Sequence, residues 1–511
     1  MSALDPRRWP PAVLAAAAPM LLGLALYIRT LMPGLGLWDT AEFQAIGPVL
    51  GIAHPTGYPT YTLLAWAGSV VLQPLGDPAL RANLLSALLV AAAAGLLGAT
   101  VTLITRRVVA GIAAGVALVV AEQPWRVALS ADPHALHVFF VALLLFMLVV
   151  WLMRLPTGPQ ADRWLVGAAV VYGLALGNHA LTILLAPGIA LFVFASSPSL
   201  LRRPRTVIGC AAGAVLTAVA VYAYLPLRAA MDPPLNYANP STWEGFSYLV
   251  FGEQFRGAFL ELPSLGEAIR QIVEWNVDAL GFVALAAPIG AIFLALRWPG
   301  LLGMLVAWFG ITWWFSLGYV NAAIERYYLG PLVVVSLLGG LAVGGLIDLL
   351  LYWGRRRPGL SELRSPVVVI GAVGLVFVGG ALLSVPATLP RVDQSGNTDG
   401  RRWVDSVMPM LERDAVIVSW WSYSTPMWYA QFVEGRRTDV FVVDDRTMLD
   451  QQLGRAEDVI DRFLGQRPVY LIRLEGDLPY YQERYRLEPV PGVLPMWSGQ
   501  VYRVIGPAGG G

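Results

Sequence analysis

The chain has 511 residues, of which 57% are hydrophobic and 14% are charged, and its formal net charge is +1. Charged residues make up about a quarter of an ordinary soluble protein, so this composition predicts an integral membrane protein. All 35 basic residues are arginines, which excludes a lysine Schiff base and the lysine of a nucleotide-binding P-loop. The single cysteine, Cys210, excludes an intramolecular disulfide. The small net charge argues against nucleic-acid binding.

Apolar stretches fill the first three quarters of the chain. About eleven of them approach the roughly 20 residues that a membrane-spanning helix needs. They cover residues 11–32, 82–105, 108–123, 134–153, 164–178, 180–194, 207–227, 279–296, 301–317, 329–351 and 367–385. The apolar stretch at residues 61–75 is too short to span, and we expect it to form a helix in the outer interface that starts at Pro59.

Arginines follow alternate stretches, so the positive-inside rule gives the orientation. With a cytoplasmic N-terminus, every inside loop carries arginine. These residues are Arg7, Arg8, Arg106, Arg107, Arg154, Arg163, Arg202, Arg203, Arg205, Arg297, Arg355, Arg356 and Arg357. The same orientation puts the loops at residues 33–81 and 228–278, all four histidines and the C-terminal region on the extracytoplasmic side.

The C-terminal region has a different composition. Residues 391–511 contain 14 arginines and 17 acidic residues, and the first 390 residues contain the other 38 of the 69 charged residues. We therefore expect a mainly α-helical membrane domain over residues 1–389 and a soluble α/β domain over residues 390–511. Helices at 401–411, 426–433 and 449–464 alternate with strands at 415–419, 440–443 and 469–474, which predicts a mainly parallel sheet. This domain carries no glycine-rich phosphate motif, and we expect it to dock an acceptor or partner, or to form a structural cap.

Two carboxylates stand in the first outer loop. Asp39 and Glu42 are three residues apart, which places them on one face of a helix. One interpretation is a capping box, with Asp39 at the N-cap and Glu42 three residues later. The other is a general base beside the membrane. The turn that follows contains two prolines and a glycine around His54 and Tyr58, and such a rigid turn suits a binding site.

Polar residues also precede the stretch at 134–153. Asp132 before Pro133 is a typical N-cap with proline at the first helical position. His134 and His137 share one helical face, and with His179 or the first outer loop they are candidate ligands of a metal ion. The sequence gives no further sign of metal, so we predict no cofactor and leave a divalent metal open.

Two arginines lie at outer boundaries of the membrane region. Arg228 follows the stretch at 207–227, and Arg326 precedes the stretch at 329–351. A guanidinium can bind a lipid phosphate through two parallel hydrogen bonds. The alternatives are interfacial snorkelling beside aromatic residues and, for Arg326, a local pair with Glu325.

Five motifs together resemble a family of bacterial multi-pass membrane proteins to which vertebrate transmembrane O-mannosyltransferase is similar. The resemblance runs from the first outer loop to about residue 351. At Asp132-Pro133-His134 the chain departs from the Glu-Val-Tyr of the family pattern. The motifs are Trp38-Asp39-Thr40-Ala41-Glu42-Phe43, His54-Pro55-Thr56-Gly57-Tyr58-Pro59, Gly177-Asn178-His179, Tyr224-Leu225-Pro226-Leu227-Arg228 and Glu325-Arg326-Tyr327-Tyr328.

The resemblance implies a GT-C glycosyltransferase fold, a polyprenyl phosphate sugar as donor, mannose as the first choice of sugar, and an acid of the first outer loop as the base. Asp39 is then the first catalytic candidate and Glu42 the second. The expected reaction is inverting transfer to a hydroxyl of a protein Ser/Thr or a glycan, at the outer face of a bacterial cytoplasmic membrane. The substrate-binding candidates are His54, Tyr58, Asp132, His134, His137, His179, Arg228 and Arg326.

Two other functions stay open from the sequence. A lipid or sugar-lipid flippase or transporter is expected to carry charges at mid-membrane and often has repeated halves. A non-catalytic scaffold would use the outer domain to bind a partner.

Overall fold

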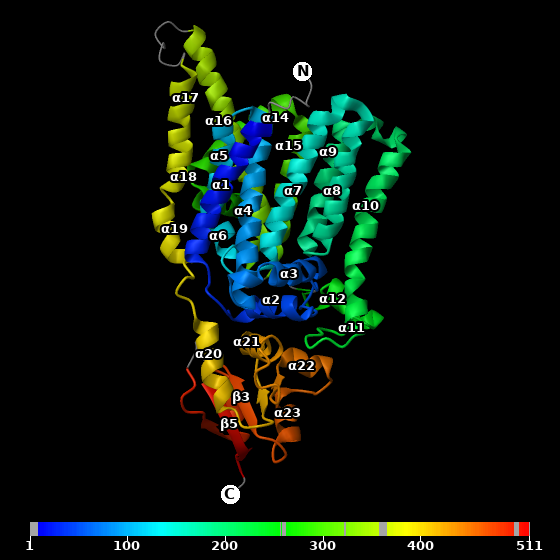
Figure 1. Ribbon diagram of the computed structural model, residues 1–511, viewed down its shortest axis with the longest axis vertical. Helices are drawn as coiled ribbons and strands as arrows, with labels where there is room; N and C mark the ends of the chain where they lie inside the picture. Colours follow the sequence, from blue (N-terminus) through cyan, green and yellow to red (C-terminus); the bar gives the residue numbers. More distant parts are fainter. Residues whose placement is uncertain are drawn as a thin grey trace.

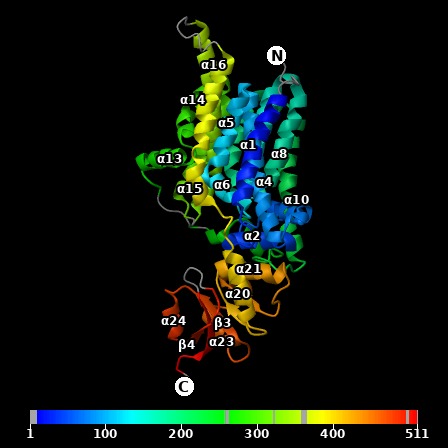
Figure 2. The same ribbon diagram turned by 60° about the vertical axis from the view of Figure 1, so that its left-hand side comes forward.

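The computed structural model describes residues 9–255, 257, 262–320, 323–356, 365–494 and 500–509. Figures 1 and 2 show a bundle of long helices with a smaller part at one end, and this smaller part contains the sheet and the C-terminus. The N-terminus lies at the opposite end of the bundle, the upper end in Figure 1.

The long helices run side by side along the bundle. They are α1 (Trp9–Thr30), α4 (Pro78–Thr105), α5 (Val108–Val120), α7 (Pro133–Arg154), α8 (Asp162–Leu176), α9 (Ala186–Ser196), α10 (Pro204–Tyr222), α14 (Phe282–Arg297), α15 (Pro299–Gly318), α16 (Leu329–Arg356) and α17 (Pro366–Gly374). Shorter turns join or extend them: η2 (Gln73–Leu75), η3 (Leu155–Ala161), η5 (Pro198–Arg202), η9 (Leu375–Gly379), α18 (Gly380–Leu382) and α19 (Val385–Val392).

The eleven predicted stretches all fall in helices, but fewer helices are long enough to span alone. Within the described residues, seven helices pass by length and composition, or eight if the bent pair of α13 (Leu265–Leu280) and α14 is one span. One of the seven, Pro133–Leu176, holds both α7 and α8, which fold back at η3 and pack together (Figure 1). Val108–Val120 and Ala180–Ser196 are shorter apolar helices.

The connections that carry the predicted inside arginines lie at one end of the bundle. The turns between α4 and α5, α7 and α8, α9 and α10, and α14 and α15 are at the same end as the start of α1 (Figure 1). Arg7, Arg8 and Arg357 lie outside the described residues. The turns that carry these arginines thus lie together at one end of the bundle, as the expected orientation requires.

Glycines allow the central helices to approach closely. A Cβ atom added to Gly98 of α4 would lie 2.3 Å from the Ala15 carbonyl oxygen of α1, and one added to Gly290 of α14 would lie 1.9 Å from the Leu338 carbonyl oxygen of α16. Small residues at such crossings are typical of helix packing in membranes, where van der Waals contact drives association.

Short helices gather at the lower end of the bundle. They are α2 (Trp38–Val49), α3 (Pro59–Val71), α6 (Glu122–Val127), η4 (Ala180–Leu185), α11 (Tyr224–Ala229), α12 (Trp243–Val250), η6 (Glu253–Phe255) and η7 (Ile324–Tyr328). Helix α13 projects from the side of the bundle above them (Figure 2). Helix α3 begins at Pro59, as predicted, and α2 and α3 lie across the lower end (Figure 1). This end faces the C-terminal part of the chain.

The C-terminal part has a five-stranded sheet in the order β2-β1-β3-β5-β4. Strand β1 pairs in parallel with β2 and β3, as predicted, whereas β5 pairs antiparallel with β3 and β4. The elements are α20 (Asp399–Val407), η10 (Met408–Met410), β1 (Val416–Val418), α21 (Trp421–Phe432), β2 (Phe441–Val443), α22 (Asp445–Asp450), α23 (Ala456–Phe463), β3 (Val469–Arg473), α24 (Leu478–Gln482), β4 (Tyr485–Pro489) and β5 (Gln500–Pro507).

Two details of this part differ from the sequence prediction. The predicted helix at 449–464 is divided into α22 and α23, because Gly454 between them has a φ of 83° that no helix accommodates. The strands β4 and β5 were not predicted, since β4 has a largely exposed pattern with little apolar alternation.

Candidate active site

A cavity of about 690 Å³ lies where the lower end of the bundle meets α21. It collects side chains from the first outer loop, the start of α7, η4, η7 and α21. Of the predicted site residues, it is lined by Asp39, His54, Tyr58, His134, His179 and Arg326.

Asp39 lies in the first turn of α2 and borders this cavity. The N-cap of α2 is Leu37, and no side chain caps the helix, so the capping-box interpretation of Asp39 and Glu42 is wrong. Asp39 Oδ1 accepts a hydrogen bond from Trp421 Nε1 at 2.8 Å. Asp39 Oδ2 lies 4.0 Å from Arg326 Nη1, and the Asp39 side chain is 42% exposed. The carboxylate is thus held in place and still accessible from the cavity.

Glu42 lies behind His54 rather than in this cavity. Its Oε1 accepts the backbone N–H of His54 at 2.9 Å, and its Oε2 lies 2.5 Å from His54 Nδ1. Burial alone would lower the pKa of His54, but the Glu42 carboxylate raises it to about 9. His54 therefore presents a protonated ring to the cavity at neutral pH, with Tyr58 Oη 3.4 Å from its Nε2.

Asp132 holds Arg326 from the other side. Its Oδ1 accepts the backbone N–H of His134 at 2.8 Å and lies 2.8 Å from His134 Nδ1, so the predicted N-cap is confirmed. Its Oδ2 lies 3.5 Å from Arg326 Nη1. Burial alone would raise the pKa of the Asp132 carboxyl, but Arg326 and His134 lower it to about 2. Arg326 is therefore placed between two carboxylates, Asp39 and Asp132.

The remaining histidines form an aromatic cluster. The ring centroids of His134 and His179 are 4.6 Å apart, and those of His137 and His179 are 5.9 Å apart. His137 is buried and does not line the cavity. Among the residues that the structure describes, no group of three or more His, Cys, Asp or Glu side chains is arranged to hold a metal ion.

Arg228 lies apart from the cavity. Its Nε donates to the Leu50 carbonyl at 2.8 Å and its Nη2 to the Val49 carbonyl at 3.1 Å. These carbonyls belong to the C-terminal end of α2, where a cation stabilises the helix dipole. Arg228 therefore supports the helix that carries Asp39, and only Arg326 of the two predicted phosphate ligands reaches the cavity.

Sequence reasoning missed Trp421, whose indole donates to Asp39 and borders the cavity. One signal was present: Trp420 and Trp421 follow β1 after a single residue, Ser419, and ligands of open α/β sheets bind at the carboxyl ends of parallel strands. Tyr237 and Tyr327 also line the cavity.

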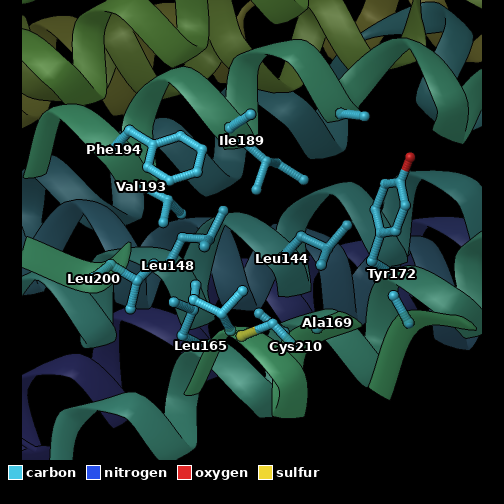
Figure 3. A pocket seen from close by; sticks show the side chains of 15 residues that line it. Leu144, Leu148, Leu165, Ala169, Tyr172, Ile189, Val193, Phe194, Leu200 and Cys210 are labelled. Atoms are coloured by element: carbon cyan, nitrogen blue, oxygen red, sulfur yellow. The ribbon is translucent and has the colours of Figure 1, made fainter. Parts of the chain in front are cut away.

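A separate cavity of about 260 Å³ lies within the bundle between α7, α8, α9 and α10. Figure 3 shows its lining, in which Tyr172 and Cys210 are the only side chains with a heteroatom. It contains no group that could perform acid-base chemistry at neutral pH. Its surface suits an apolar chain.

The family model for the Protein O-mannosyl-transferase TMEM260 N-terminal domain matches residues 39–201. Mouse Protein O-mannosyl-transferase TMEM260 is 24% identical over 93% of this chain, and the match covers 66% of the mouse protein, slightly less than two thirds. The resemblance found in the motifs is thus confirmed.

Two solved structures share the fold. ArnT from Cupriavidus metallidurans, bound to undecaprenyl phosphate, has a TM-score of 0.62 at 12% identity and covers 95% of this chain and 97% of its own. The archaeal oligosaccharyltransferase AglB from Archaeoglobus fulgidus, in complex with an inhibitory peptide and a dolichol-phosphate, has a TM-score of 0.55 at 13% identity, covering 94% of this chain and 73% of its own. The chain is therefore a multi-pass membrane protein with the GT-C fold, and its sequence is similar to the TMEM260 O-mannosyl-transferases.

Proposed function

We propose that the chain is a membrane glycosyltransferase that transfers a sugar, with mannose as the first choice, from a polyprenyl phosphate to a hydroxyl of a protein Ser or Thr. The observation that carries this proposal is the convergence of Asp39 and Arg326 on one cavity at the end of the bundle. We infer that this end faces outward, which in a bacterial cell means the outer face of the cytoplasmic membrane.

The proposed reaction is an inverting displacement. The acceptor oxygen attacks the anomeric carbon while the bond from that carbon to the phosphate oxygen breaks. The acceptor proton passes to the Asp39 carboxylate, and the bonding electron pair leaves with the polyprenyl phosphate. General-base assistance of this kind contributes about 10²–10⁴-fold. The 2.8 Å hydrogen bond from Trp421 fixes one Asp39 oxygen and leaves the other for the acceptor.

Two cations border the same cavity as Asp39. Arg326 and the protonated ring of His54 both line it, and we assign both to the donor phosphate. Preorganised charges near a departing phosphate stabilise the negative charge that develops on it. Asp132 positions Arg326 at 3.5 Å, and Glu42 positions His54. Glu42 is therefore proposed as a positioning residue and not as the base.

The apolar cavity supports a lipid-linked donor. Residues of η4, including Ile183 and Leu184, line the polar cavity, and Ala186 and Ile189 of the following α9 line the apolar one (Figure 3). The two cavities thus border successive parts of one segment. We propose that the phosphate lies in the polar cavity and that the isoprenoid chain follows α9 into the apolar one.

A transfer assay tests the proposal. The purified protein in lipid nanodiscs is incubated with radiolabelled polyprenyl phosphate mannose and a Thr-containing peptide. We expect transfer by the wild type and a loss of at least about 10²-fold in Asp39→Asn. Asp477→Asn is the matched control, because Asp477 is exposed and caps α24 without a side-chain hydrogen bond. Full activity of Asp39→Asn would contradict the assigned base. Flipping of the labelled lipid without transfer would favour the flippase.

A further inference from the structure

A second cavity, of about 480 Å³, lies between the C-terminal part and the loop that follows α11. Its walls come from residues 232–239 on one side and from α21, β2 and α22 on the other. It differs from the cavity that Asp39 lines, and the reaction described above places no substrate in it. Glu42 also lines this second cavity, and Tyr237 and Trp421 line both cavities.

This cavity follows the edge of the sheet. Strand β2 is the last strand on one side of the sheet, and three consecutive residues at this edge, Val440, Phe441 and Val442, line the cavity. Because successive side chains of a strand point to opposite faces, a cavity on one face would contact alternate residues. Contact with consecutive residues therefore indicates a cavity along the strand edge.

The backbone pairing of β2 agrees with this position. The Phe441 N–H donates to the Ala415 carbonyl, and the Val443 carbonyl accepts from the Ser419 N–H, so both residues bond toward β1. In a parallel pair the residues that bond to the neighbouring strand alternate. The N–H and C=O of Val442 between them consequently point away from β1, to the outer edge of the sheet. The Val440 carbonyl already accepts a hydrogen bond from Gln431 Nε2 at 2.7 Å, so Val442 offers the main-chain groups for a new partner. Buried backbone groups of this kind require a hydrogen-bonding partner.

The cavity is built from fixed groups. Arg446 Nε donates to Asp450 Oδ2 at 2.8 Å, and the Arg446 guanidinium lies 3.9 Å from the ring centroid of Tyr237. Asp450 Oδ2 also accepts the Ala238 N–H at 3.2 Å. These contacts join the loop at residues 232–239 to α22 and hold the two walls together.

The second cavity adjoins the first through two aromatic side chains. Trp421 and Tyr237 line both cavities, and their rings meet edge to face at 6.2 Å. The Trp421 indole N–H donates to Asp39. A molecule in the second cavity that passes these two rings therefore arrives beside the Asp39 carboxylate.

We propose that the second cavity binds the acceptor as an extended peptide, which adds as a strand to the edge of β2 and presents a Ser or Thr hydroxyl to Asp39. The inference rests on the proposed function. Main-chain donors and acceptors along a strand edge match a peptide backbone, and side-chain pockets beside the edge supply specificity. A glycan has no repeating N–H and C=O groups to pair with β2, so an edge strand favours a peptide.

Two variants of the full-length protein test this site. Thr438 is exposed and lines the cavity, so Thr438→Trp should obstruct it without changing the core, and Thr438→Ser is its control. Val442→Pro removes the N–H that points to the outer edge of the sheet, a change that an edge strand tolerates, and Val442→Ala keeps that N–H. Melting temperatures establish that each variant is folded, and Thr438→Trp serves alone if Val442→Pro does not fold.

Two measurements separate this inference from the proposed function. Fluorescence anisotropy follows the binding of a labelled Thr-containing peptide, and initial rates give KM for the peptide and for polyprenyl phosphate mannose. We expect Thr438→Trp and Val442→Pro to weaken peptide binding and raise its KM at least tenfold, with an unchanged donor KM. Unchanged peptide binding would overturn the acceptor site alone. Transfer by the wild type to a glycan but not to the peptide would overturn both the acceptor site and the protein acceptor of the proposed function, and would leave only sugar transfer itself. Peptide bound at β2 without any sugar transfer would overturn the proposed function instead.

Discussion

Replacing Glu42 with glutamine should make the rate of sugar transfer depend on pH between pH 6 and 8, a range in which the wild-type rate is nearly constant. Glu42 Oε2 lies 2.5 Å from His54 Nδ1, and this carboxylate raises the pKa of His54 against the effect of burial. Among the other charged groups nearby, Asp39 raises the pKa and Arg326 lowers it. Glutamine still accepts the backbone N–H of His54 but has no charge. The pKa of His54 should then fall to 6.5, its ordinary value, or below.

The size of the effect follows from the two pKa values. With a pKa of about 9, about nine tenths of His54 is protonated at pH 8, against about 3% with a pKa of about 6.5. If the protonated ring binds the donor phosphate, transfer at pH 8 should fall about 30-fold. At pH 6 about three quarters of His54 is protonated in the variant, so most of the loss should disappear.

The same pair makes stability depend on pH. The pKa of His54 is raised on folding, so its contribution to stability is fully present below pH 6.5 and is lost as the pH rises through about 9. The difference between these pKa values corresponds to about 3 kcal/mol. The melting temperature of the wild type should therefore fall over this range. Glu42→Gln should melt lower at pH 6 and change less with pH.

Initial rates of mannose transfer at pH 6, 7 and 8 provide the assay. Glu274→Gln is the control, since Glu274 is exposed on α13. Equal activity of Glu42→Gln and wild type at pH 8 would refute a role for the charged ring. An equal loss at pH 6 and pH 8 would refute it as well, because a structural defect would not respond to protonation of His54.

Three other substitutions have distinct expected outcomes. Arg326→Gln should lower kcat for transfer by about 10²-fold or more, because a preorganised charge is lost, and Arg326→Lys should restore part of this activity. A wild-type kcat in Arg326→Gln would contradict the phosphate contact. Trp421→Phe keeps an aromatic ring but loses the hydrogen bond to Asp39, so kcat should fall about tenfold with an unchanged KM for the donor. A change in the donor KM alone would argue for a different role of Trp421. Arg228→Gln removes hydrogen bonds to two carbonyls of α2, so the free energy of unfolding should fall by about 1–3 kcal/mol. This loss should be visible as a lower melting temperature. A specific rise in the KM for the donor would instead show a direct role in phosphate binding.

The sequence predicted the helices well because apolar length is a local property. The prediction of helix length was weaker where a local break ends a helix early. Residues 108–120 form a helix shorter than a usual span, because the backbone at Ala121 is extended. The stretches at 134–153 and 164–178 were predicted as separate helices, and the chain does fold back between them, at Gly158 with a φ of 73°. In the C-terminal part, the parallel strands were predicted from continuous apolar runs. The antiparallel strand β4 was not, because its residues are mostly exposed.

The site could be predicted only in part, since a residue type does not state where its side chain points. Asp39 and Arg326 were expected in one site, and both line the cavity. Arg228 has the same chemistry as Arg326, yet the carbonyls at the end of α2 bind it away from the cavity. Likewise, the spacing of Asp39 and Glu42 suggested one shared face. After α2 the chain turns back, which brings His54 next to Glu42. Asp39 instead accepts a hydrogen bond from Trp421.

The C-terminal part is built into the candidate site by a single face of α21. Trp421 donates to Asp39, Thr425 Oγ1 donates to the Trp38 carbonyl at 2.8 Å, and Tyr429 Oη accepts the Ala79 N–H at 3.1 Å. The three side chains are four residues apart, which puts them in one row along the helix. Because all three bonds cross to the membrane part, the position of the Asp39 carboxylate depends on how this helix docks. The C-terminal part therefore contributes directly to the candidate site, because the same helix contacts the proposed base and lines the cavity that we assign to the acceptor.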